Sequence, residues 1–186
     1  MQKACNLVTM SIDLPPIFGI AGYSGSGKTA LLARILPILK GRGVRVAVIK
    51  RTHHEVEMDQ PGKDSHTLRL AGARQVLLAS AGRWAMMVER DPGEEPSPQE
   101  WAQRLPPGEQ DLVLVEGYKA APIPKLEVHR PAVGKPLLCS DDPWVRAVAS
   151  DVPLVLPDGV PQLDLNDHAA VVRWLLEQTG LDDHGG

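Results

Sequence analysis

A glycine-rich segment between an apolar run and a helix-like run constrains this chain more than any other feature. Residues 22–29 read G-Y-S-G-S-G-K-T and match the pattern G-x-x-x-x-G-K-[S/T] at every fixed position. Residues 17–21 before it are mostly apolar, as in a buried strand, and apolar residues recur at helical spacing from Leu31 to Leu36 after it. The segment therefore joins the end of a strand to the start of a helix.

Such a segment suits a polyphosphate. Glycines let the backbone wrap tightly, because they accept positive φ angles and carry no Cβ. The N–H groups of the loop then converge on phosphate oxygens at the positive end of the helix dipole. We expect Lys28 to reach the phosphates as a mobile charge and the Thr29 hydroxyl to bind Mg²⁺. The predicted nucleotide contacts in the loop are Gly22, Ser24, Gly25, Ser26, Gly27, Lys28, Thr29 and Ala30.

An acid at the end of a second apolar run completes this predicted site. Residues 111–117 read D-L-V-L-V-E-G, which is typical of a central strand that ends in Glu116. A carboxylate delivered beside the phosphate loop binds Mg²⁺ or one of its water ligands. The alternative is a buried strand followed by an ordinary loop acid. We predict Glu116 as a metal ligand and, together with Lys28, as a catalytic residue.

Polar residues also follow the second predicted strand, residues 44–49, whose β-branched content is typical of burial on both faces. Ligands of open α/β sheets bind at this edge. We predict Asp59 as a metal ligand and catalytic residue. Asp64 is either a ligand or the N-cap of a short helix, and Ser65 is the other candidate for that cap. His53 and His54 are adjacent on an extended segment, so at most one of them points toward the nucleotide.

The order of the predicted elements indicates an α/β protein. Strand, loop, helix and strand form a βαβ unit, so the first two strands should be parallel. We expect a P-loop NTPase-like, three-layer fold with a mostly parallel twisted sheet, helices on both faces and a β-hairpin extension. The hairpin pairs residues 75–79 with residues 84–88.

The ends of the helices and of the domain are also predicted. Pro37 should kink the first helix or end its regular part, and Asn166 should cap the last one. Residues 1–16 are expected to be a flexible leader, residues 17–180 the nucleotide-binding domain and residues 181–186 a flexible tail. Neither an internal repeat nor a boundary within the domain is visible.

Composition limits the class of partner and the compartment. A net charge of −3 offers no electrostatic case for nucleic acid or an anionic membrane, and no apolar run is long enough to span a bilayer. Cys5 and Cys139 form no C-x-x-C pair, so neither a zinc site nor a disulfide framework is implied. We therefore expect a cytoplasmic protein.

Several short stretches follow one another in a familiar order. They are T-H-H at 52–54, D-x-P-G-K-D-S at 59–65, R-W at 83–84, V-E-G-Y-K at 115–119 and A-S-D-V-P at 149–153. This order resembles the molybdopterin-guanine dinucleotide biosynthesis protein B family, MobB, from residue 17 to the last helix. The second and fourth stretches are more specific than the phosphate loop. Arg51 departs from the family pattern, which has His there.

The resemblance implies properties that spacing alone does not. It implies a homodimer that binds GTP with Mg²⁺ and hydrolyses it weakly. It also implies an accessory role to the molybdopterin guanylyltransferase, which makes the guanine dinucleotide form of molybdenum cofactor, with molybdopterin as a possible further ligand.

Asp151 is predicted to select the base. A carboxylate accepts hydrogen bonds from N1–H and N2–H₂ of guanine together, whereas adenine offers no such pair of donors. The alternative is an exposed acid in the turn before Pro153.

Two classes of function remain open. As a GTPase the protein should be slow, because no glutamine or arginine is obviously placed to orient water or stabilise charge. As an adapter it would hold the nucleotide or pterin phosphate and dock on the transferase, with hydrolysis incidental. A small-molecule kinase is disfavoured, because the acidic, Pro-rich residues 91–98 do not resemble an arginine-rich lid.

Overall fold

The computed structural model describes residues 14–52, 63–91 and 93–182. They form two compact units. The first holds the described residues up to Arg51 and from Pro96 onward, and the second holds those between Thr52 and Glu95. The expected domain, residues 17–180, therefore contains a core unit and an inserted unit. Within the described residues, no helix is both long and apolar enough to cross a bilayer.

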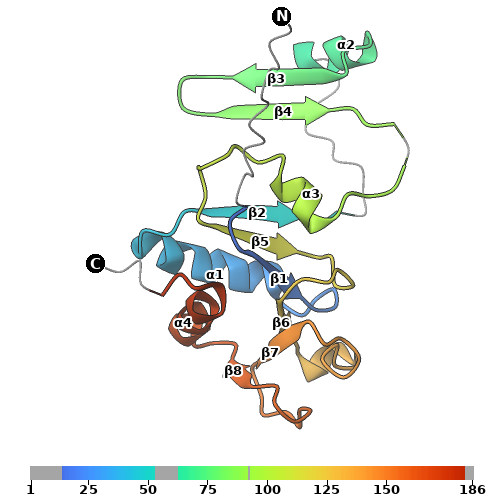
Figure 1. Cartoon of the computed structure of the whole chain (residues 1–186). Coiled ribbons are helices and arrows are strands. Elements are labelled where there is room, and N and C mark those ends of the chain that lie inside the picture. Colours follow the sequence, from blue (N-terminus) through green and yellow to red (C-terminus); the bar gives the residue numbers. More distant parts are fainter. Residues whose placement is uncertain (1–13, 53–62, 92, 183–186) are drawn as a thin grey trace, which may run out of the picture. The chain divides into compact units, whose positions relative to one another are not determined.

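A parallel sheet of six strands forms the centre of the first unit among the described residues (Figure 1). In spatial order the strands are β2 (Val46–Lys50), β5 (Leu112–Glu116), β1 (Ile17–Ala21), β6 (Lys125–Val128), β7 (Val145–Ser150) and β8 (Gln162–Asp164). The predicted parallel relation of the first two strands is confirmed, with β5 between them and parallel to both. The end of β5 therefore lies beside the loop that follows β1.

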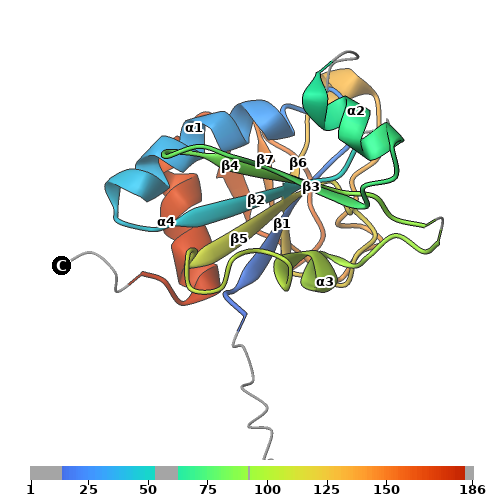
Figure 2. The same cartoon turned by 90° about the horizontal axis from the view of Figure 1, so that it is seen from above.

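Alternation along β5 divides the core between the two faces of the sheet. Leu112 and Leu114 pack with the apolar sides of α1 (Lys28–Gly41) and α4 (His168–Thr179), which lie on one face (Figure 2). Val113 and Val115 pack on the other face, with α3 (Pro98–Ala102). This period of two is that of a strand buried on both sides. The predicted three-layer fold is confirmed.

The second predicted strand differs in burial. β2 lies at one edge of the sheet, and Val48 is 41% exposed, whereas the sequence predicted burial on both faces. β-branched residues favour any strand, so their density does not distinguish a central strand from an edge strand.

Two helices of this unit test the predictions about helix ends. α1 continues past Pro37 to Gly41, so the proline does not end the helix, which was one of its two predicted effects. α4 is capped by Asp167, whose side chain accepts from the Ala170 N–H, and not by Asn166. The N–H of Asn166 instead donates to the Asp164 carboxylate at 2.8 Å, which holds Asn166 in the preceding turn.

The second unit consists of α2 (Asp64–Leu70) and the hairpin of β3 (Gln75–Ala79) and β4 (Trp84–Val88). The hairpin is confirmed at the predicted residues. The N-cap of α2 is Lys63, so neither Asp64 nor Ser65 caps this helix as predicted. Both lie in its first turn, because the helix begins one residue earlier than an Asp64 cap requires.

One face of the hairpin is apolar and exposed. The register pairs Leu77 with Met86 and Ala79 with Trp84, so these side chains share a face. Leu77, Trp84, Met86 and Val88 on that face are each about half exposed. On the opposite face Val76 is buried and Met87 is half-buried.

Candidate nucleotide-binding site

The glycine-rich loop begins where β1 ends and passes directly into α1. Gly25 and Gly27 have φ angles of +82° and +101°, in the left-handed region that glycine adopts at little cost. Among the described atoms, nothing beyond the chain neighbours lies within 4 Å of a Cβ built at Gly25, so the loop is open on that side. Gly27 is the N-cap of α1 and makes no side-chain cap, which leaves first-turn N–H groups for an outside acceptor.

The floor of the loop excludes a larger residue at Gly22. A Cβ built there would lie 2.4 Å from the Val128 carbonyl oxygen and 2.8 Å from the Ser26 hydroxyl. Gly22 also has a φ of +139°. The Ser26 hydroxyl is buried and has no hydrogen-bond partner among the described residues. The loop is therefore packed tightly underneath and open above.

Lys28 folds back over the loop. Its Nζ donates to the carbonyl oxygens of Gly22 at 2.9 Å and Tyr23 at 2.8 Å. Burial lowers the pKa of Lys28 from its ordinary value of 10.5; Glu116 opposes this shift, and the neighbouring lysines reinforce it. A lysine with a destabilised charge is prepared to gain an anionic partner.

A cation–π contact joins the loop to the segment after β5. Lys119 Nζ lies 4.7 Å from the centre of the Tyr23 ring. Its charge is one of those that lower the pKa of Lys28. The specific stretch at 115–119 therefore contributes a cation as well as Glu116 to the surroundings of the loop. Arg51, the departure from the family pattern, lies 5.5 Å from the ring of Tyr118 in the same stretch.

The Thr29 hydroxyl and the Glu116 carboxylate are in direct contact. Thr29 Oγ1 donates to Glu116 Oε1 at 2.7 Å, although 87 positions separate them in the chain. The register explains the contact, because Glu116 pairs with Ile20 near the end of β1. Neighbouring ligands of an octahedral Mg²⁺ lie about 2.9 Å apart, so the spacing of these oxygens suits the ion. The structure thus brings together the two predicted metal ligands that it describes.

Lys50, one of the polar residues that follow the second predicted strand, is part of this cluster, although the sequence indicated no specific role for it. Its Nζ donates to Thr29 Oγ1 at 3.2 Å and lies 3.3 Å from Glu116 Oε1. Lys50 is the last residue of β2 and pairs with Glu116 across the ladder. A lysine at the end of a β-branched run does not by itself indicate a functional site. Its place beside Glu116 follows only from the pairing of β2 with β5.

Arg130 is the second functional candidate that the sequence did not indicate. Its Nε donates to the Ser26 carbonyl at 3.2 Å, and its Nη1 lies 2.9 Å from Asp151 Oδ2. No arginine was obviously placed at the loop from the sequence, and the structure brings Arg130 to it. Arg130 follows β6, whose place beside β1 brings the end of that strand to the loop. Asp151 follows β7 and joins the site through this ion pair.

The other predicted residues do not belong to the described part of the first unit. Asp59, His53 and His54 lie outside the described residues. Asp64 belongs to the first turn of α2 in the second unit. Among the described residues, no group of three or more His, Cys, Asp or Glu side chains is arranged to hold a metal ion. A metal here would depend on the Thr29 hydroxyl, the Glu116 carboxylate and oxygens of the nucleotide, a donor set that suits Mg²⁺.

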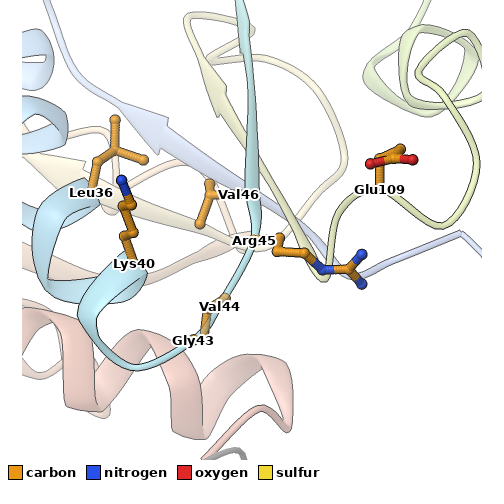
Figure 3. Close-up of a pocket in the computed structure, with 7 residues that line it drawn as sticks. All are labelled: Leu36, Lys40, Gly43, Val44, Arg45, Val46 and Glu109. Atoms are coloured by element: carbon orange, nitrogen blue, oxygen red, sulfur yellow. The ribbon is translucent and has the colours of Figure 1, made fainter. Parts of the chain in front are cut away.

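A separate depression of about 430 Å³ lies between the end of α1 and the start of β2 (Figure 3). It is lined by Leu36, Lys40, Gly43, Val44, Arg45, Val46 and Glu109. Arg45 is paired with Asp111 at 2.5 Å and also donates to a backbone carbonyl. The depression lies at the beginning of β2, whereas the loop cluster lies at the strand ends, so we assign it no part in the site.

Comparison with known proteins identifies the family. A sequence model described as MobB, molybdopterin guanine dinucleotide synthesis protein B, matches residues 17–151. The chain is 45% identical over 170 residues to a molybdopterin-guanine dinucleotide biosynthesis adapter protein of Escherichia coli, covering 89% of this chain and 96% of that protein. It is 46% identical over 151 residues to the Haemophilus influenzae protein of the same name, covering 81% and 82%.

A solved structure agrees with these sequence matches. The crystal structure of Bacillus subtilis MobB superposes with a TM-score of 0.67 at 26% identity, covering 88% of this chain and 98% of the other. The family model, the two curated relatives and this fold all indicate the same assignment. The chain belongs to the MobB family.

Proposed function

We propose that this protein binds GTP with Mg²⁺ at the loop of residues 22–29 and acts as an adapter in molybdopterin guanine dinucleotide biosynthesis, accessory to the molybdopterin guanylyltransferase. The names of the relatives support the adapter role. The observation that carries the nucleotide site is the 2.7 Å contact between Thr29 and Glu116 beside an open glycine loop. Hydroxyl, carboxylate and loop amides are the groups that a magnesium–polyphosphate complex needs.

Each residue has a distinct role in this proposal. N–H groups of the loop and of the first turn of α1 hold phosphate oxygens. Lys28 exchanges its two carbonyl acceptors for phosphate oxygens, which its lowered pKa favours. Thr29 and Glu116 hold Mg²⁺, which when bound neutralises phosphate charge. Asp59 remains a proposed third ligand.

Hydrolysis is expected to be slow and secondary to binding. Arg130 contacts the loop, yet its guanidinium is engaged by Asp151 and the Ser26 carbonyl. A guanidinium held in this way is not free to follow charge that develops on a transferred phosphoryl group. Single-turnover hydrolysis of GTP should therefore be slow with this protein alone. If adding the transferase leaves the rate of GTP hydrolysis unchanged, the result supports the adapter function. A large increase in that rate supports a GTPase function.

Asp151 is proposed to select guanine, and its pair with Arg130 provides the control. Asp151→Ala removes the carboxylate and the pair, whereas Arg130→Ala removes the pair and keeps the carboxylate. If Asp151 reads the base, only the first variant should lose the preference for GTP over ATP. Loss of preference in both variants, or in neither, excludes this role.

A homodimer is proposed through the exposed hairpin face. An apolar face formed by Leu77, Trp84, Met86 and Val88 is costly to leave in water. A second copy presents the same face, so a two-fold interface matches it with itself.

A panel of nucleotides tests the proposed binding. Isothermal titration calorimetry should detect GTP and GDP in the presence of Mg²⁺, with much weaker binding of ATP. A protein that binds none of them, or that binds ATP as tightly as GTP, contradicts the proposal.

A further inference from the structure

We propose that Lys50 is a tethered cation that neutralises Glu116 in the nucleotide-free site and competes with the divalent ion for Glu116 and Thr29. The inference rests on the proposed magnesium site and goes beyond it. It predicts that an amino acid of this chain opposes the binding of the metal.

The geometry places Lys50 at the two oxygens that the metal needs. Lys50 Nζ lies 3.2 Å from Thr29 Oγ1 and 3.3 Å from Glu116 Oε1, and these two oxygens are 2.7 Å apart. An ion bound to both at ordinary Mg–O distances would lie within about 5 Å of Nζ, wherever around the pair it sits. A divalent ion and an ammonium at that separation repel each other strongly, so the two cations cannot share the pair without cost.

Burial decides which partner moves. The Glu116 side chain is 9% exposed and the Lys50 side chain is 55% exposed. Glu116 belongs to a central strand with neighbours on both sides, whereas Lys50 ends an edge strand. The flexible stem of lysine allows the ammonium to swing into water without backbone movement. The carboxylate therefore stays in place, and the ammonium leaves when the metal arrives.

The other charges near the pair do not replace Lys50. Lys28 Nζ is bonded to two loop carbonyls, and Lys119 lies over the Tyr23 ring. Among the described residues, Lys50 is thus the lysine whose ammonium contacts both Thr29 and Glu116. Without it, the buried Glu116 carboxylate would lose its nearest counter-charge and should attract a divalent cation more strongly.

Titration of the nucleotide-free protein with Mn²⁺, followed by electron paramagnetic resonance of the free ion, tests the competition directly. Mn²⁺ prefers the same oxygen ligands as Mg²⁺. Binding that depends on Glu116 is obtained by subtracting the signal of Glu116→Gln. We expect Lys50→Gln and Lys50→Met to tighten this binding about fivefold or more, the lower end of ordinary coupling between sites. Lys50→Arg keeps the charge and should remain close to wild type.

Lys40→Gln is the matched control. It removes the same charge from an exposed lysine that lines the depression at the beginning of β2, and it should leave Mn²⁺ affinity unchanged. The proposal is overturned if Lys50→Gln and Lys50→Met bind Mn²⁺ as wild type does, or if none of the proteins shows binding that depends on Glu116. Either result would make the contact an ordinary surface ion pair.

A second arm separates this inference from the proposed function. The same proteins are titrated with GTP in the presence of Mg²⁺. Tighter Mn²⁺ binding by Lys50→Gln without any binding of GTP would refute the nucleotide proposal and keep the competition. Binding of GTP together with unchanged Mn²⁺ affinity in Lys50→Gln would refute the competition and keep the nucleotide proposal.

Discussion

At the residue scale, Lys28 should couple the proposed binding of a nucleotide to proton uptake. Burial lowers its pKa in the free protein, and phosphate anions would raise it again by favouring the charged form. Binding should therefore take up protons at alkaline pH, in the range where the free protein has begun to lose the Lys28 proton and the complex still holds it. Calorimetry of GTP binding in buffers of different ionisation enthalpy measures this uptake.

Lys28→Arg is the control for proton uptake. Its guanidinium stays charged throughout this range of pH, so the variant should lack the contribution of residue 28. Equal uptake by wild type and the variant, or net release of protons attributable to Lys28, would contradict the role given to Lys28.

Cys139 should be an unreactive thiol. Its pKa is raised to about 11, mainly by burial and also by the negative charge of Glu127. Because the thiolate is the reactive form, alkylation of the folded Cys5→Ser protein at pH 7 should be at least about a hundredfold slower than that of the urea-unfolded chain. Mass spectrometry of iodoacetamide labelling measures both rates. Similar rates would show that Cys139 is neither buried nor shifted.

Single residues were predictable where a local pattern specifies them. The glycine loop carries its own spacing, and Glu116 follows an unmistakable apolar run, so both were placed from the chain alone. Lys50 and Arg130 have no such pattern. Their roles arise because β5 lies between β2 and β1 and because β6 lies on the other side of β1. That order is a property of the sheet and not of any single segment.

At the scale of the element, the cap of α4 offers a direct comparison. Asp167 accepts from the Ala170 N–H at 2.9 Å, so Asp167→Ala should lower the free energy of unfolding by about 1 kcal/mol. Asn166→Ala is the matched control, because Asn166 uses its backbone N–H and not its side chain in the turn. Urea denaturation followed by circular dichroism measures both variants. A larger loss from Asn166→Ala would reverse the assignment of the cap.

Helices and strands were predictable where alternating apolar residues define them or turn residues mark their ends. β3 and β4 match the predictions because pattern and boundary signals agree. β8 was missed, because Gln162–Asp164 has too few residues to show alternation. The short cluster of Asp and Asn before α4 offers several competent caps, and the local turn chooses among them.

At the scale of the whole molecule, the hairpin face predicts the oligomeric state. Leu77 and Leu78 are neighbours on β3 with 58% and 47% exposure, but they point to opposite faces. Leu77→Asp places a charge on the proposed interface and should weaken the dimer at least tenfold, a loss of about 1.4 kcal/mol. Leu78→Asp places the same charge on the other face and should not. Analytical ultracentrifugation distinguishes these outcomes; monomeric wild type or an equal effect would contradict the interface.

The fold class could be predicted from the order of elements, because a strand–loop–helix–strand pattern with a phosphate loop is compatible with few sheet topologies. The division at Thr52 and Glu95 could not, because no change in composition marks Thr52, although the acidic, Pro-rich residues 91–98 include Glu95. Separation into units depends on which contacts form across the chain. Such contacts are visible only in three dimensions.

The central claim is that the loop and the end of β5 form one magnesium–nucleotide site through Thr29 and Glu116. The most direct measurement is the affinity for GTP by calorimetry, with Mg²⁺ and with a chelator, for wild type, Glu116→Gln and Thr29→Val. The account predicts that Mg²⁺ strengthens binding by wild type at least about tenfold and that both variants lose most of this gain. An equal gain from Mg²⁺ in wild type and both variants would contradict it.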